Sequence, residues 1–397
     1  YKNVGHDTYP AGSYVNLNAN NPNAWTYAPD LDSRPFNHLD SWDLQGRVTA
    51  QATQKLKVGF SWQETRTCFC SSSINATTAP EAALYRPTPT LRNVMGDWTM
   101  PLTNRVLIDG SFVRRIQDQA RRVPPDTHPD MISVTEQSLG NLVYRTVRAS
   151  GGNPPLRETV FKTLFIRSAV SYITGAHAFK AGFTIGSALE DDEYHYGTQP
   201  VSYRFNNGIP NQITLYAYPV GTVMNYDWNT ESGAFVQDRW TIGRLTATYG
   251  LRYDYYKTSF PEQTVGPTAL LPNRNITIPA SPGVSWHDLT PKTGAAYDLF
   301  GTGKTALKVS LNKYVAGQGN SGEFGRPLNP INRLVNVTTR NWTDGNRNFT
   351  PDCDLINPAA NGECAAMANR NFGQSSTAGS AVYDPDVLSG WGIRGYN

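Results

Sequence analysis

Five oxygen-bearing side chains lie close together in the stretch TDGNRNFTPDCD and could bind a hard cation: Asp344, Asn346, Asn348, Asp352 and Asp354. Carboxylate and amide oxygens are the ligands that calcium takes from proteins. The spacing is not that of an EF-hand, because the closing glutamate is missing, and loops rich in Asn and Asp often bind no metal. A structural calcium site is therefore a hypothesis beside the simpler interpretation of a polar loop. No other cofactor is expected.

The four cysteines lie in sequence that is typical of loops. Cys353 and Cys364 occur in PDCDLINPAANGEC, and a disulfide between them would fit an oxidising, extracytoplasmic compartment. The alternative is a zinc site, but the Cys-x-Cys and Cys-x10-Cys spacings match no usual zinc motif. Cys68 and Cys70 either pair with each other through a strained ring or stay free.

Residues for covalent catalysis do not form a recognisable motif. The six histidines are scattered, and no Gly-x-Ser-x-Gly nucleophile elbow occurs. The stretch GTGKT at 301–305 resembles the end of a phosphate-binding loop, but the upstream glycine spacing and the following helix are missing. A hairpin turn explains it better. The acidic run 190–193 is best interpreted as a solvated strand end, and the sequence predicts no enzyme.

One stretch, residues 233–256, shows the kind of secondary structure that recurs along the chain. After a turn near Gly243, apolar and polar residues alternate, so that one face carries mainly Leu, Ala and Tyr. Because successive side chains of a strand point to opposite faces, this is a strand with one apolar and one polar side. Its length suits a tilted strand that crosses a bilayer, which needs about 9–11 residues. Tyr253 and Tyr255 at its end are typical of an interfacial aromatic girdle.

The same pattern recurs along the chain and predicts five long hairpins. Their turns are expected near 53–55, 101–104, 174–175, 243 and 301–303, and a further hairpin outside the membrane near 207–208. Long polar loops are expected at 64–92 and 117–159. Short turns thus alternate with long loops, as in outer-membrane barrels with short periplasmic turns and long extracellular loops. The strands have no fixed period, which argues against propellers and solenoids.

Composition agrees with a transmembrane barrel. The chain has 397 residues, of which 39% are hydrophobic and 17% charged, with 21 Tyr and 9 Trp. The hydrophobic share is low for a soluble core and the aromatic share high, as expected where only alternate residues face lipid. The net charge of +3 gives no indication of nucleic-acid binding. The first residues resemble no signal peptide.

The stretches FVQDRWTIGRLTATYGLRYDYY and DLTPKTGAAYDLFGTGKTALKVSLNKY resemble the barrel of TonB-dependent outer-membrane receptors. The later DCDLINPAANGEC and YDPDVLSGWGIRGYN are similar to the Oar-like branch. The resemblance implies a 22-stranded barrel, an N-terminal plug and import driven through TonB. No plug, TonB box or terminal aromatic strand is visible, so the chain is interpreted as an internal fragment of about half a barrel.

The resulting expectation is an all-β, antiparallel transmembrane barrel fragment in the bacterial cell outer membrane. Residues 1–40 would be an extracellular loop, 41–317 the barrel hairpins and 318–397 a long extracellular loop. Arg47, Lys57, Arg244 and Arg252 are expected to line the lumen and contact the missing plug. The expected partners are outer-membrane lipid, the TonB complex through the plug, and an unidentified extracellular ligand. The alternatives are a passive porin-like channel and an extracellular adhesion or carbohydrate-binding β-protein.

Overall fold

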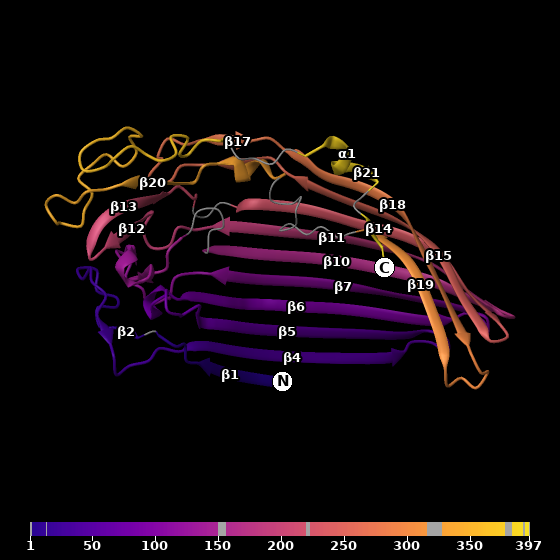
Figure 1. Ribbon diagram of the computed structural model, residues 1–397. Helices are drawn as coiled ribbons and strands as arrows, with labels where there is room; N and C mark the ends of the chain where they lie inside the picture. The colour runs from indigo at the N-terminus through magenta and orange to yellow at the C-terminus, as the bar shows by residue number, and fades with distance from the viewer. Residues whose placement is uncertain are drawn as a thin grey trace.

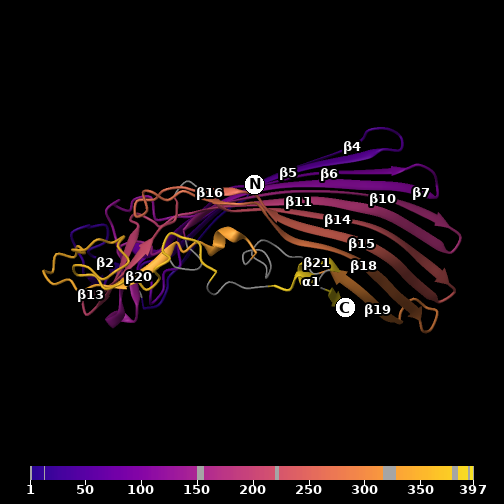
Figure 2. The ribbon, with the colours of Figure 1, turned by 90° about the horizontal axis from the view of Figure 1, so that it is seen from above.

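The computed structural model describes residues 2–12, 14–149, 156–219, 223–315, 328–377, 383–391 and 394–396. Its main feature is a curved antiparallel sheet in which the strands lie in the order of the chain (Figures 1 and 2). Twelve strands follow this path, and β21 (Ser389–Trp391) pairs with β18 in parallel. The twelve are β1 (Lys2–Thr8), β4 (Asn37–Gln51), β5 (Lys57–Ser72), β6 (Leu84–Pro101), β7 (Val106–Arg121), β10 (Arg157–Thr174), β11 (His177–Tyr194), β14 (Val223–Ile242), β15 (Leu245–Phe260), β18 (Ser281–Asp298), β19 (Ala306–Val315) and β22 (Arg394–Tyr396).

Five short turns join these strands at one end of the sheet, where the sequence predicts them (Figure 1). Gly175 and Gly243 have φ angles of 57° and 55° in the two tightest turns, a left-handed conformation that glycine adopts without steric cost. In the turn after β18, the Asp298 carboxylate accepts the backbone N–H groups of Gly301 and Gly303 at 3.0 and 2.8 Å. GTGKT is therefore part of a hairpin turn, as predicted from the sequence.

The sheet has one apolar and one polar face. Residues directly opposite each other on neighbouring strands share a face, and such a row on the apolar side crosses six strands. It contains Val48, Phe60, Gly96, Phe112, Ile166 and Ile185. Val48 and Ile185 are 69% and 54% exposed, so the row is not covered by the rest of the chain.

The strands are longer than the sequence pattern indicates, which corrects three expectations. Strand β5 continues to Ser72 and β6 starts at Leu84, so most of the expected loop 64–92 is sheet, and Cys68 and Cys70 lie in a strand. Likewise, β7 and β10 extend into the expected loop 117–159. Residues 1–40 include β1, which pairs with β4. These polar segments do not alternate apolar and polar residues, so the strands were not apparent from the pattern.

A second, five-stranded sheet lies at the end opposite the short turns, as both views show (Figures 1 and 2). We call this sheet, with the loops packed on it, the cap. Its hairpin turns at Asn207 and Gly208, as predicted, and it contains one parallel pair, β8 with β12. Its order is β20 (Val337–Asn341), β13 (Ile209–Tyr216), β12 (Val201–Asn206), β8 (Ser133–Glu136) and β9 (Leu142–Tyr144).

Short elements complete the described fold. Two small ribbons pair β2 (Val15–Asn16) with β3 (Pro29–Asp30) and β16 (Gln263–Val265) with β17 (Ile276–Ile278). The helical turns are η1 (Pro80–Ala82), η2 (Gln137–Leu139), η3 (Pro330–Arg333) and α1 (Pro385–Leu388). No helix among the described residues is long and apolar enough to cross a membrane.

The largest hydrophobic core lies in the cap. Phe205, Ile213 and Trp342 are buried there. Arg145 lies 3.9 Å above the Trp25 ring and donates hydrogen bonds to the carbonyls of Pro22, Ala24 and Ile132. Burial lowers the pKa of Arg145 to about 10. The arginine thus ties the N-terminal segment to the cap.

Candidate ligand-binding site

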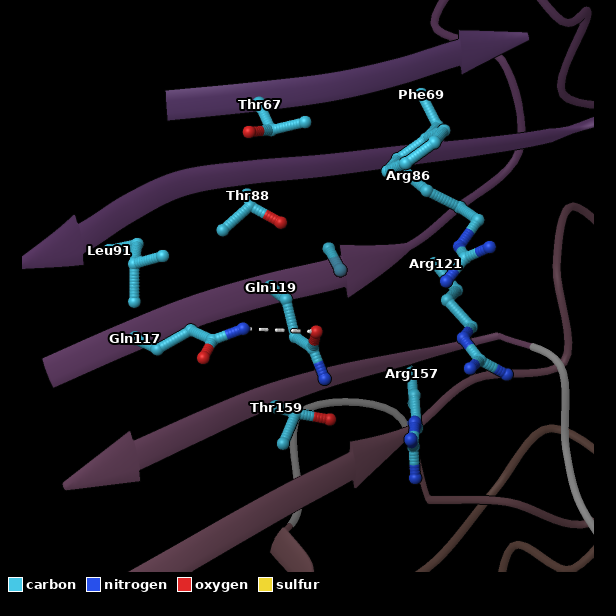
Figure 3. Close-up of a pocket in the computed structure, with 11 residues that line it drawn as sticks. Thr67, Phe69, Arg86, Thr88, Leu91, Gln117, Gln119, Arg121, Arg157 and Thr159 are labelled. Atoms are coloured by element: carbon cyan, nitrogen blue, oxygen red, sulfur yellow. Dashed lines mark hydrogen bonds between the residues drawn. The ribbon is translucent and has the colours of Figure 1, made fainter. Parts of the chain in front are cut away.

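A pocket of about 240 Å³ opens on the polar face of the main sheet, near the ends of the strands that lead to the cap (Figure 3). Side chains of β5, β6, β7 and β10 line it. The lining residues are Thr67, Phe69, Arg86, Thr88, Leu91, Gln117, Gln119, Ala120, Arg121, Arg157 and Thr159.

Three arginines, Arg86, Arg121 and Arg157, line one side of the pocket. Figure 3 shows their guanidinium groups in a column along that side. The cross-strand register explains this, because Arg121 lies directly opposite Arg157 and Arg86 directly opposite Phe69. The Arg86 guanidinium lies 5.5 Å from the centre of the Phe69 ring, in a cation–π contact. The ring therefore orients Arg86 and leaves its in-plane N–H groups available.

Arg157 is positioned by an acidic residue on the next strand, which lies on the same face of the sheet directly opposite Thr159. Its Nη1 lies 3.3 Å from Oδ2 of Asp192 on β11, and the Thr159 hydroxyl donates to Oδ1 of the same carboxylate at 2.5 Å. Asp192 is buried, with a side chain only 1% exposed. Within the described part of the chain, the buried Nε of Arg157 has no hydrogen-bond partner. A buried donor of this kind favours an acceptor supplied by a ligand or water.

The remaining wall supplies neutral hydrogen-bonding groups. Gln117 Nε2 donates to Gln119 Oε1 at 3.3 Å, and Thr67 and Thr88 add hydroxyl groups. None of the eleven lining residues is Asp, Glu, His or Cys. Guanidinium groups beside amides and hydroxyls suit the binding of a carboxylate or phosphate, for which arginine offers a planar pair of donors.

The four predicted lumen residues lie outside this pocket. Arg47 pairs with Asp97 at 2.9 Å, and Lys57 is the exposed first residue of β5. Arg252 contacts Asp254 at 2.5 Å on the polar face. Arg244 is a correction: it lies in the turn between β14 and β15, because the strand ends at Ile242 before the left-handed Gly243.

The sequence pattern does not reveal the pocket arginines. Arg86, Arg121 and Arg157 all fall in the segments 64–92 and 117–159 that were expected to be loops. Their alignment depends on strand register beyond the apolar band, where hydrophobic alternation gives no signal. The continuation of β5, β6, β7 and β10 beyond the apolar band places them on one face.

The predicted calcium residues are brought together in part. Asp352 Oδ2 accepts the side-chain amides of Asn346 and Asn348 at 2.6 and 3.2 Å, and the Asp344 carboxylate accepts two backbone N–H groups. Asp354 instead accepts the N–H of Ile356. No group of three or more His, Cys, Asp or Glu residues that could hold a metal occurs among the described residues. Calcium binding stays a prediction.

Both cysteine pairs are disulfides in the structure. Cys353 is bonded to Cys364, and Cys68 to Cys70 within β5. The loop closed by Cys353 and Cys364 is also held by Arg340, whose guanidinium donates to the carbonyls of Asp354, Asn357, Ala359 and Ala365. Burial lowers the pKa of Arg340.

Comparison with known proteins identifies the family. A family model described as an outer membrane beta barrel domain matches residues 8–389, so the chain belongs to this family of transmembrane antiparallel β-barrels. The protein is accordingly located in the bacterial outer membrane, and the apolar face of the main sheet faces lipid. The polar face, with its pocket, is the lumen side. A comparison with curated proteins found no match.

Solved structures similar to the chain are also outer-membrane proteins. They include the outer membrane transporter YddB from Escherichia coli (12% identity, TM-score 0.48, 85% of this chain and 43% of that one). The copper transporter OprC has 10% identity and a TM-score of 0.46, over 78% of this chain and 44% of its own. The alcaligin outer membrane receptor FauA from Bordetella pertussis has 11% identity and a TM-score of 0.44, over 77% and 41%. The chain spans less than half the length of these three structures.

Proposed function

We propose that the chain forms part of the wall of a TonB-dependent outer-membrane receptor of the Oar-like branch, which binds an extracellular ligand and imports it. Family membership and the asymmetry of short turns and long loops support this proposal. The TonB complex would act through a plug region that accompanies the barrel. The main sheet is open, and open edges are not stable in lipid, so further strands would close the barrel.

The arginine pocket carries the proposal for binding. It lies on the lumen side between the membrane and the cap, where a ligand entering from outside would pass. Arg86, Arg121 and Arg157 face it without an acidic residue in the lining. We therefore propose that the ligand carries a carboxylate or phosphate group. Binding and passage would need no covalent chemistry.

The binding test compares pocket variants of the full-length protein. The probe is citrate, a small tricarboxylate, titrated by calorimetry. Because a hydrogen bond to a charged group contributes about 1.5–3 kcal/mol, Arg86→Gln should weaken binding about tenfold or more. Arg167→Gln is the matched control, since Arg167 faces the same lumen nearer the turns and donates to the Ser111 hydroxyl at 2.8 Å. Equal affinities of the two variants, or no binding by the wild type, would contradict an anion pocket.

Energy dependence separates the receptor from its two alternatives. Uptake of the bound ligand by intact cells should stop when the proton-motive force is collapsed with an uncoupler. A passive porin-like channel would continue to admit the ligand down its gradient. An adhesion or carbohydrate-binding protein would retain ligand at the surface and show no uptake in either condition.

A further inference from the structure

Four basic side chains form a band on the lipid-facing side of the sheet: Arg66 on β5, Arg92 on β6, Arg114 on β7 and Lys162 on β10. We call them the outer basic band. They share the face of the apolar row because Arg92 lies opposite Glu64, Arg114 opposite Val94 and Leu164, and Lys162 opposite Ile116. Consecutive members are therefore diagonal neighbours, about 7–8 Å apart in the backbone.

The band lies at the level of the outer lipid headgroups. Arg92 is nine residues before the end of β6, Arg114 eight residues after the start of β7, and Arg66 nine residues after the start of β5. Those strand ends are at the short turns, on the periplasmic side. Because a tilted strand crosses the hydrocarbon in about 9–11 residues, these side chains lie at its outer edge.

One acidic residue organises two of the arginines. The Glu64 side chain is only 7% exposed, and its Oε2 accepts from Arg92 at 2.9 Å while its Oε1 accepts from Arg66 at 3.2 Å. The Arg66 guanidinium also lies 5.5 Å from the Trp42 ring. A guanidinium has five N–H donors, so both arginines keep donors for another acceptor.

Arg114 differs from the other three members of the band in its contacts. It is exposed, and it forms no side-chain hydrogen bond or ion pair with any residue that the structure describes. Apart from Glu64, the acids near the band lie on its outer side: Asp118 is four residues further along β7, and Asp191 lies 4.0 Å from Lys162. The side toward the membrane centre is apolar, with Trp62, Val94 and Leu164.

We propose that the outer basic band binds the phosphate of an outer-leaflet lipid headgroup, with Arg92 and Arg114 as its principal donors. The phosphate would lie against the guanidinium groups, and the acyl chains would extend over the apolar row that begins directly below. An anionic head joined to several acyl chains matches both halves of this surface. Arginine suits the phosphate because its donors are planar and paired. The site faces away from the lumen and does not depend on the transported ligand.

The test measures lipid binding to the full-length protein, purified in detergent and freed of lipid. The probes are bisphosphorylated lipid A and the same lipid after removal of both phosphates, and bound copies are counted by native mass spectrometry. Wild-type protein should bind the phosphorylated lipid at least tenfold more tightly. Arg114→Gln should lose most of this difference. Since Arg114 has no partner among the described residues, the substitution should leave folding intact.

Arg115→Gln is the matched control, because Arg115 is adjacent in β7 but points to the lumen side, where it contacts Gln117. It should bind the phosphorylated lipid as the wild type does. Equal binding by the Arg114 and Arg115 variants would overturn the proposal. So would equal binding of the two lipids, or full displacement of lipid by millimolar inorganic phosphate, which would indicate a site for free anions. None of these outcomes bears on the lumen pocket.

Discussion

Arg157 on β10 and Asp192 on β11 form an ion pair, 3.3 Å between Nη1 and Oδ2, at the level where the main sheet leaves the membrane for the cap. The carboxylate is buried beside the pocket lining, on the same face of the sheet, and the guanidinium lines the pocket; their side chains are 1% and 13% exposed. One residue thus serves the stability of the sheet and the charge of the lumen together. Substitutions in the pocket should therefore have two kinds of effect: one on the stability of the sheet, where this pair is broken, and one on ligand binding, where the charge of the lumen changes.

Removal of Arg157 should destabilise the barrel. Arg157→Gln removes the guanidinium partner of the buried Asp192 carboxylate, which keeps its hydrogen bond from the Thr159 hydroxyl, and breaking a buried pair in this way costs about 3 kcal/mol. The free energy of unfolding in urea, measured in lipid vesicles, checks this. The double variant Arg157→Gln/Asp192→Asn should recover much of the loss. An unchanged free energy in Arg157→Gln would show that Asp192 does not rely on the pair.

A side chain at Gly110 should displace Trp98 on the lipid-facing side. Trp98 lies directly opposite Gly110, and a Cβ atom there would overlap the Trp98 ring. Gly110→Ala should therefore shift the ring and cost about 1–2 kcal/mol. Quenching of tryptophan fluorescence by brominated lipids reports the shift. Gly46→Ala is the control, since a Cβ at Gly46 meets nothing within 4 Å, and equal quenching in both variants would contradict the prediction.

The cap hairpin should loosen in acid because of Glu136. Its carboxylate accepts the Ser138 hydroxyl at 2.6 Å and the backbone N–H groups of Asn207 and Gly208 at 3.0 and 2.9 Å. Burial raises the pKa of Glu136, but these hydrogen bonds outweigh it and the net pKa is lowered. Because the pKa of Glu136 is lowered in the folded state, its carboxylate stabilises the cap. This stabilisation is fully present at pH values above the pKa of glutamate in the unfolded chain, about 4.3.

That stabilisation is lost as the pH falls through the folded pKa. We expect the protection factors of the Asn207 and Gly208 amides to decrease below about pH 4. Hydrogen exchange followed by mass spectrometry measures them. Glu136→Gln should have low protection at every pH and no such decrease. A parallel decrease in both proteins would assign the pH dependence to another group.

The Cys353–Cys364 disulfide should restrain one loop of the cap. A cross-link over a loop of this size contributes about 3 kcal/mol in the chain-entropy model. Replacing both cysteines with serine should speed proteolysis between 353 and 364, although the Arg340 contacts to the loop carbonyls would remain. Replacing Cys68 and Cys70 with serine should leave that rate unchanged. Equal rates in wild type and the first variant would show that Arg340 alone holds the loop.

Calcium binding by the 344–354 loop can be decided by calorimetry. Asp344 and Asp352 supply the carboxylates, and the Asn346 and Asn348 amides that now donate to Asp352 would turn their oxygens toward the ion. If the loop binds calcium, the wild type should release or absorb heat on titration and Asp344→Asn/Asp352→Asn should not. Absence of any heat from the wild-type protein would remove the calcium hypothesis.

Local chemistry in the sequence determined the membrane hairpins. Each strand that crosses lipid must alternate apolar and polar residues. The two tightest short turns contain Gly175 and Gly243, and the cap hairpin turns at the Asn207–Gly208 pair. Both the alternation along a strand and the turn residues are local signals, which can be recognised within a few residues of sequence. The strand pairs, the five turns, the polar lumen face and the hairpin outside the membrane could therefore be predicted without the structure.

Only the tertiary structure decided what happens beyond the apolar band. The strands continue there in polar sequence, and cross-strand register alone places Arg121 opposite Arg157 and Arg86 beside Phe69. The cap likewise pairs β8 with β12 in parallel and brings Trp25 onto Arg145, contacts between segments far apart in the chain. Non-local pairing of this kind leaves no periodic signal, because neither face of these segments is fixed by lipid.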